Sequence, residues 1–138
     1  MSGLTTIARI VRPHPGWLVP AGLWAALIWL GSAQPASGFR HIGPVSTARL
    51  PLGRLAPVVH FTGYAVLSGL LWLGLSWQRR RSRALAAVLA ATAYGVVDEW
   101  HQSSVSGRDA SGFDVATDAA GAVAGVLVAH AINNINDA

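Results

Sequence analysis

Five of the six acidic residues in this strongly apolar chain lie within one short stretch, at Asp98, Glu99, Asp109, Asp114 and Asp118. A charged side chain next to hydrocarbon costs roughly 2.5–3.5 kcal/mol on insertion scales at mid-bilayer. Groups that are retained at such a cost usually bind a ligand, transfer protons or pair with one another. The sequence therefore predicts that this stretch contains the functional site.

Helical spacing brings some of these residues together, because residues three or four apart share a face. Asp98 and Glu99 each lie within one turn of Gln102. The two acids project about 100° apart around a helix, so we do not expect them to share one partner equally. Arg108 is the only arginine in the connection that follows and is the expected counter-ion. Two interpretations stay open: an ion-pair clamp that fixes this connection, or a site that handles a substrate or protons.

Two further pairs extend the candidate site. His60 and Tyr64 are four apart and are expected on one face of an earlier helix. His60 suits a general base, a ligand or a hydrogen-bonded core histidine. Ser111 and Asp114 have the spacing of a capping box, so helix capping competes with a functional role for Asp114. Asp118 lies one turn deeper, where capping does not explain it, and is assigned to the site or its supporting network.

The composition defines the class of protein. Hydrophobic residues make up 52% and charged residues 12% of 138 residues, against about 25% charged in a typical soluble domain. This favours an integral membrane protein with one domain over residues 1–138. The absence of cysteine excludes disulfides, thiolate nucleophiles and cysteine-bound metals. The net charge of +4 does not indicate nucleic-acid binding, because four of the ten arginines form one run between apolar segments.

Four apolar segments must position these groups: residues 17–33, 57–77, 84–102 and 113–132. Each approaches the length needed to cross a hydrocarbon core of about 30 Å. Pro57 is expected in the first turn of the second segment. The segment 34–56 contains several prolines and glycines and is not expected to form one continuous helix. Gly121 and Gly125 form a G-x-x-x-G motif that allows close helix approach.

Arginine distribution predicts the orientation. The run from Arg79 to Arg83 fills the connection between the second and third segments, and Arg9 and Arg12 precede the first. The positive-inside rule places both regions in the cytoplasm. The predicted fold is all-α: an integral, multi-pass membrane four-helix bundle with both termini in the cytoplasm. The polar residues then converge at the extracytoplasmic end.

A metal site is not expected. His60, Glu99, Asp114 and Asp118 have suitable ligand types, but their spacing does not match a known metal-binding pattern. The sequence predicts neither a metal nor another cofactor.

Together, these residues resemble the VanZ-like family of small bacterial membrane proteins over residues 57–128. The matching motifs are His60-Phe61-x-x-Tyr64, Asp98-Glu99-x-x-Gln102, Gly107-Arg108, Asp114-Val115 and Gly121-Ala122-x-x-Gly125. One departure is Asp118, where the family is expected to have asparagine. This additional acid is compatible with one protonated carboxylate. The resemblance implies a link to reduced susceptibility to the glycopeptide teicoplanin, but it does not assign a reaction.

Two functions are considered first, and the sequence does not decide whether the protein is an enzyme. In one, the protein binds a cell-envelope component at the outer face, or alters access to it. The ligand-binding candidates are Tyr64, Gln102, Arg108, Asp114 and Asp118. In the alternative, it is a hydrolase or transferase acting on a lipid-linked envelope substrate. Its catalytic candidates are Glu99, His60 and Asp98, with Glu99 or His60 as general base.

Two other classes rank lower. A structural subunit would use the polar cluster only for packing. A transporter would need more room for alternating access than four short helices provide, unless the protein forms a homo-oligomer. The expected partners are the lipid bilayer and a lipid-linked envelope molecule, and the oligomeric state stays open.

Overall fold

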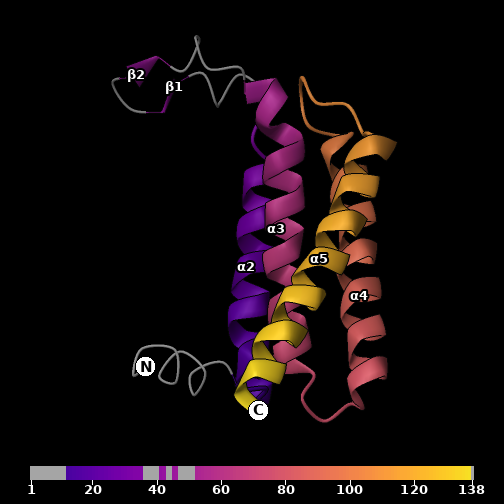
Figure 1. Cartoon of the computed structure of the whole chain (residues 1–138). Coiled ribbons are helices and arrows are strands. Elements are labelled where there is room, and N and C mark those ends of the chain that lie inside the picture. The colour runs from indigo at the N-terminus through magenta and orange to yellow at the C-terminus, as the bar shows by residue number, and fades with distance from the viewer. Residues whose placement is uncertain (1–11, 36–40, 43–44, 47–51, 138) are drawn as a thin grey trace.

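The computed structural model describes residues 12–35, 41–42, 45–46 and 52–137. Their four α-helices are α2 (Leu18–Ser32), α3 (Leu52–Gly74), α4 (Arg80–Gln102) and α5 (Gly112–Asp137), and a short 3-10 helix, η1 (Pro15–Trp17), precedes α2. The helices lie side by side along one long axis (Figure 1). The protein is therefore all-helical apart from one small hairpin.

That hairpin lies in the segment before α3. Its strands, β1 (His41–Ile42) and β2 (Val45–Ser46), pair antiparallel, with His41 opposite Ser46. As expected, no continuous helix runs through the described parts of residues 34–56. The hairpin and the α4–α5 connection lie at the same end of the molecule, and the α3–α4 connection lies at the other (Figure 1).

Several helix boundaries differ from the sequence expectations: α3 ends at Gly74 where residue 77 was expected, α5 ends at Asp137 where residue 132 was expected, and both α3 and α4 begin earlier. Pro57 lies inside α3, because this helix begins five residues earlier at Leu52. A proline near a helix start is tolerated, since the first N–H groups have no intrahelical acceptor and only one bond beyond them is lost. The arginine run also does not fill the connection, because α4 begins at Arg80. Arginine is a good helix former and extends the apolar segment backwards.

Only two of the four helices are long and apolar enough, by length and composition, to cross a membrane: Leu55–Gly74 in α3 and Gly112–Ile135 in α5. At 15 residues, α2 is about 22 Å long and falls short of a hydrocarbon core of about 30 Å. The helix α4 has charged residues at both ends and does not meet this criterion either.

Glycines let α3 and α5 pack closely. A Cβ at Gly121 would overlap the carbonyl oxygen of Phe61, and one at Gly125 would overlap that of Ala65. The G-x-x-x-G motif therefore acts as predicted and brings two helix backbones together. Ser68 strengthens the same contact, because its hydroxyl donates to the Ala122 carbonyl at 2.8 Å.

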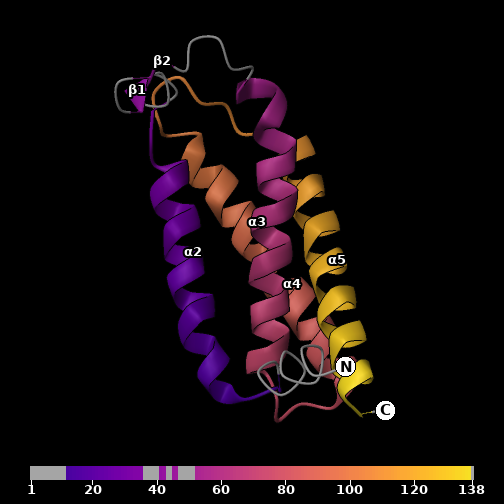
Figure 2. The ribbon, with the colours of Figure 1, turned by 60° about the vertical axis from the view of Figure 1, so that its left-hand side comes forward.

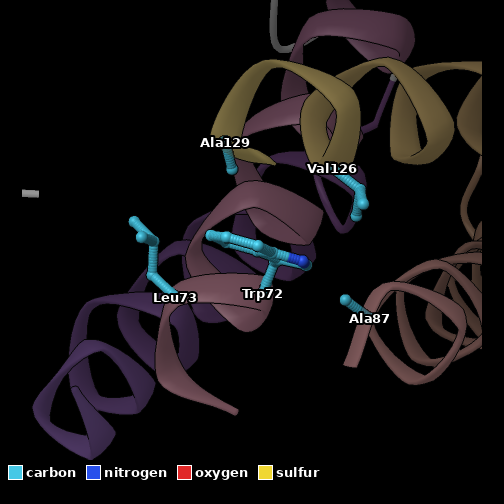
Figure 3. Close-up of a cluster of buried hydrophobic side chains, with 5 residues drawn as sticks. All are labelled: Trp72, Leu73, Ala87, Val126 and Ala129. Carbon is cyan, nitrogen blue, oxygen red and sulfur yellow. The ribbon is translucent and has the colours of Figure 1, made fainter. Parts of the chain in front are cut away.

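The apolar core follows this contact along the bundle. Small alanines at Ala91 and Ala122 leave room for Tyr64 and Leu67 in one cluster. A second cluster surrounds Trp72, which lies between α4 and α5 (Figure 3) and packs with Leu73, Ala87, Val126 and Ala129. Small residues on α4 and α5 thus accommodate large side chains from α3.

By contrast, α2 is joined to the bundle by hydrogen bonds at several levels, and α3 lies between it and α5 (Figure 2). Trp24 Nε1 donates to the Gly63 carbonyl at 2.8 Å, and the Tyr94 hydroxyl donates to the Ala25 carbonyl at 2.7 Å. These bonds use backbone oxygens of regular helices and hold α2 against α3 and α4.

Candidate functional site

A histidine and two carboxylates from three helices meet at the end of the bundle that carries the α4–α5 connection. His60 Nδ1 of α3 lies 2.9 Å from Asp118 Oδ1 of α5 and 3.9 Å from Glu99 Oε1 of α4. We call these three residues the histidine–carboxylate cluster. When Asp118 is ionised, His60 Nδ1 is the donor of this hydrogen bond, because an ionised carboxylate only accepts.

A glycine on α4 makes room for the deepest carboxylate. A Cβ at Gly95 would stand 2.8 Å from Asp118 Oδ2. The Asp118 side chain is fully buried, and within the described residues its Oδ2 has no hydrogen-bond partner. Gly95 was not predicted from the sequence, because the sequence does not show which residue of α5 packs against it.

The amide of Gln102, the last residue of α4, links three side chains. Its Nε2 donates to Asp98 Oδ2 at 3.1 Å and to Glu99 Oε1 at 3.2 Å. The expectation that these two acids would not share one partner equally is therefore wrong, because an amide nitrogen carries two hydrogens and this one lies at nearly the same distance from both. Gln102 Oε1 accepts from Arg108 Nη1 at 2.9 Å. The arginine thus connects to both carboxylates through the glutamine amide.

The second oxygen of Glu99 holds the start of α5. The Ser111 backbone N–H donates to Glu99 Oε2 at 2.9 Å, while Ser111 Oγ accepts the Asp114 N–H at 3.3 Å. One half of the expected capping box is therefore present. The other half comes from Glu99 on α4 in place of the side chain of Asp114. The Asp114 carboxylate adds its negative charge near His60 and Glu99.

The end of α2 contributes a group that sequence reasoning missed. Ser32 Oγ donates to Asp98 Oδ1 at 2.5 Å, and both side chains are buried. A single serine at the end of an apolar helix carries no signal of a contact 66 residues away. Its hydroxyl could equally have bonded only to its own helix, where it also lies 2.9 Å from the Trp29 carbonyl.

A cavity of about 530 Å³ adjoins this polar network. Its walls are largely apolar side chains of α2 and α3, including Leu27, Ile28, Val58 and Val59. Leu27, Val58 and Val59 are also exposed on the side of the bundle. The cavity is therefore reached from the lateral, apolar surface. Polar lining residues are found where α2, α3 and α4 meet: Ser32, His60, Tyr64, Asp98, Gln102 and Arg108.

The ring side chains of Tyr64 and His101 lie near the site, and of these two only Tyr64 lines the cavity. The Tyr64 ring stacks with that of His60 at a centroid distance of 6.5 Å, and its buried hydroxyl has no partner among the described residues. His101 stacks on Trp29 of α2 at a ring-centroid distance of 3.9 Å and does not line the cavity.

The histidine–carboxylate cluster also has the geometry to hold a cation. One ligand atom from each of His60, Glu99 and Asp118 lies within 4.8 Å of the others. Nitrogen and carboxylate oxygen ligands of this kind suit a divalent transition metal. The sequence expectation of no metal stays a prediction.

The eight predicted site residues therefore fall into three groups. Five line the cavity: His60, Tyr64, Asp98, Gln102 and Arg108. Glu99 and Asp118 contact His60. Asp114 lies in the first turn of α5 and acts on the cluster through its charge.

This arrangement defines a class: a small all-helical protein with two apolar helices of membrane-spanning length and a buried polar network at one end. Residues 17–133 match the model of the VanZ/LLP1 family, and the chain belongs to this family. The resemblance seen in the motifs is confirmed over most of the chain. No curated protein and no solved structure matches it.

Proposed function

We propose that this protein is a single-domain integral membrane four-helix bundle of the bacterial plasma membrane, with both termini in the cytoplasm. Family membership and the two apolar helices support a membrane protein. Large apolar side chains are exposed along the sides of all four helices, as a lipid-facing surface requires, among them Leu23, Val59, Leu89 and Leu127. The arginines at the α3–α4 end favour a cytoplasmic position for that end and an outer position for the candidate site.

The cysteine-free chain allows a direct test of this orientation. Single cysteines at Ser106, in the α4–α5 connection, and at Gln78, in the α3–α4 connection, place one exposed thiol at each end. A membrane-impermeant maleimide added to intact cells should label Ser106→Cys and not Gln78→Cys. Labelling of Gln78→Cys alone would show that the topology is the reverse of the proposed one. Labelling of both variants only after lysis would contradict exposure of the site at the outer face.

We propose further that the protein binds an amphiphilic component of the cell envelope at this site. The observation that carries the proposal is the cavity, which has apolar walls open to the lateral surface and ends at charged and polar side chains. Its volume lies within the range of about 300–1,000 Å³ typical of ligand sites. A lipid chain would lie along Leu27, Val58 and Val59, with its polar group at the far end.

The polar residues suit a lipid-linked phosphate or sugar. Arg108 supplies a guanidinium, which pairs well with phosphate oxygens. The carboxylate of Asp98 accepts hydrogen bonds from hydroxyl groups of a sugar. Binding of such a molecule would withdraw it from other recognition events at the cell surface. This is the route by which we expect the protein to affect teicoplanin susceptibility.

Arg108→Gln tests this proposal. We expect purified Arg108→Gln to bind a polyprenyl phosphate about 10- to 100-fold more weakly than the unmodified protein, because the phosphate loses a charge-assisted hydrogen bond of about 1.5–3 kcal/mol. Arg81→Gln is the matched control, since it removes an exposed arginine from the other end. Equal binding by all three proteins would contradict the proposed head-group site. In cells, the same comparison of teicoplanin susceptibility tests the envelope role.

A second candidate is a membrane-embedded hydrolase or transferase, and the contact between His60 and Asp118 favours it. Because Asp118 holds Nδ1, Nε2 is the ring nitrogen that would act as general base toward a lipid-linked substrate in the cavity. Glu99 is a less suitable base, since both of its oxygens already accept hydrogen bonds. We would measure phosphate release from a polyprenyl pyrophosphate. Turnover that is lost in His60→Gln, with binding retained, supports an enzyme, and no turnover leaves the binding proposal.

A further inference from the structure

A buried arginine lies at the other end of the bundle, near the start of α4. Arg83 is only 5% exposed, and its guanidinium carbon lies 4.0 Å from the ring centroid of Trp72. Its Nε has no hydrogen-bond partner, and no carboxylate forms an ion pair with it in the part of the chain that the structure describes. A buried charge without a counter-charge is strongly unfavourable, so this guanidinium calls for an anion.

Trp72 presents a second buried donor beside the first. Its side chain is fully buried in the apolar cluster between α4 and α5 (Figure 3). Its indole Nε1 has no acceptor within the described residues. Buried polar groups are nearly always hydrogen-bonded. Two adjacent unpartnered donors and no acceptor indicate a missing acceptor group.

The start of α4 adds positive potential at the same end. Its N-cap residue, Arg79, forms no side-chain cap, and the first turn contains no acid. The first N–H groups of this 23-residue helix therefore have no side-chain acceptor at the cap, and they attract anions together with the helix dipole. Arg83 is the fourth residue of α4, so it lies within one turn of these N–H groups.

Arg80 lies one turn before Arg83 on the same face of α4. Its Nη1 donates to Asn134 Oδ1 at 2.7 Å, and Asn134 Nδ2 lies 3.2 Å from His130 Nε2 on α5. This chain of contacts ties Arg80, at the start of α4, to polar side chains of α5.

We propose that Arg83, with Arg80 beside it, binds a phosphate group at the uncapped start of α4, and that its source is the head group of an anionic phospholipid. The positive-inside orientation places this end at the cytoplasmic leaflet, where anionic head groups are concentrated. Arginine suits phosphate because its planar guanidinium donates two parallel hydrogen bonds. This site is separate from the proposed outer-face site and does not depend on what that site binds.

Thermal unfolding of the full-length protein in a mild detergent tests this proposal. Three additions are compared: phosphatidylglycerol, phosphatidylcholine and inorganic phosphate. We expect phosphatidylglycerol to raise the Tm by several degrees more than phosphatidylcholine does. Arg83→Gln should lose most of this difference, and Arg81→Gln should keep it. Arg81 is the matched control, because it is an exposed arginine in the same turn.

Each outcome of this comparison supports or overturns the proposed phosphate site. A Tm rise with inorganic phosphate alone would support the phosphate site and replace its lipid source with a free phosphate. No difference between the two lipids would overturn the proposal, and so would an equal loss in Arg83→Gln and Arg81→Gln, which indicates diffuse charge. If Arg83→Gln does not fold, Arg80→Gln is measured instead. An unchanged phosphatidylglycerol effect in that variant contradicts the site.

Discussion

Replacing Glu99 with glutamine changes one atom at the centre of the polar network. Glu99 accepts two hydrogen bonds: Oε2 from the Ser111 backbone N–H at 2.9 Å and Oε1 from Gln102 Nε2 at 3.2 Å. A glutamine side chain has one oxygen and one NH₂ group. In either amide orientation, one of these two contacts becomes a donor facing a donor. The substitution is nearly isosteric, so the expected effect comes from charge and hydrogen bonding alone.

The free-energy change follows from these contacts. A hydrogen bond to a charged group contributes about 1.5–3 kcal/mol, and a buried donor left without a partner costs about 1–3 kcal/mol. Relief of the desolvation of the buried charge, and of repulsion from Asp114 and Asp118, offsets part of this loss. Because Glu99 is only 3% exposed, solvent screens these effects little. We expect Glu99→Gln to lower the free energy of unfolding by about 2 kcal/mol, which corresponds to a Tm decrease of roughly 4–10 °C for a chain of this size.

The assay is thermal unfolding of purified protein in one detergent near pH 7. Asp109→Asn is the matched control, since it removes one negative charge from an exposed position in the connection between α4 and α5. We expect its Tm to stay within about 1–2 °C of the unmodified protein, as for most surface substitutions. An unchanged or increased Tm for Glu99→Gln would refute the reasoning. It would indicate that the Glu99 charge is retained at a cost to stability, as is common at binding and catalytic sites.

Three further predictions concern packing, helix attachment and metals. Gly125→Ala should destabilise the protein by about 3 kcal/mol or more, because the added methyl overlaps the Ala65 carbonyl. The control Gly22→Ala, whose added methyl meets nothing within 4 Å, should be neutral or slightly stabilising. Chemical denaturation of both variants measures these changes. Tyr94→Phe should cost about 1 kcal/mol, because the hydroxyl loses its bond to the Ala25 carbonyl, and hydrogen exchange should show faster opening of α2. A metal chelator should leave the Tm unchanged, because His60 and Asp118 of the histidine–carboxylate cluster are already joined by a direct hydrogen bond at 2.9 Å. A Tm decrease that Zn²⁺ or Mn²⁺ reverses would contradict the expectation of no metal.

Much of the site could be predicted because helical spacing is visible in the sequence. Gln102 lies within one turn of both Asp98 and Glu99, and it contacts both. The G-x-x-x-G motif correctly predicted close approach between two helices. Both conclusions needed only the period of the helix, which is the strongest signal that a single sequence carries.

The parts that could not be predicted depend on contacts between helices distant in the sequence. Ser32 and Gly95 are small residues in apolar helices, and only the packing of α2 and α5 against α4 reveals what they contact. The same holds for Arg83. By sequence it belongs to a run of arginines that marks orientation, yet its side chain is buried against Trp72 while Arg81 is exposed.

The bond between Glu99 and the Ser111 backbone has a consequence for how the protein is made. It joins the last turn of α4 to the residue just before α5, across a connection of only nine residues, 103–111. In the topology proposed above, an unpaired Glu99 carboxylate would oppose entry of α4 into the bilayer, and the free N–H groups at the start of α5 would oppose entry of α5. Within a helical hairpin each group satisfies the other. In this proposed topology, biogenesis should therefore favour insertion of α4 and α5 as a pair, with the α4–α5 connection crossing the membrane already folded.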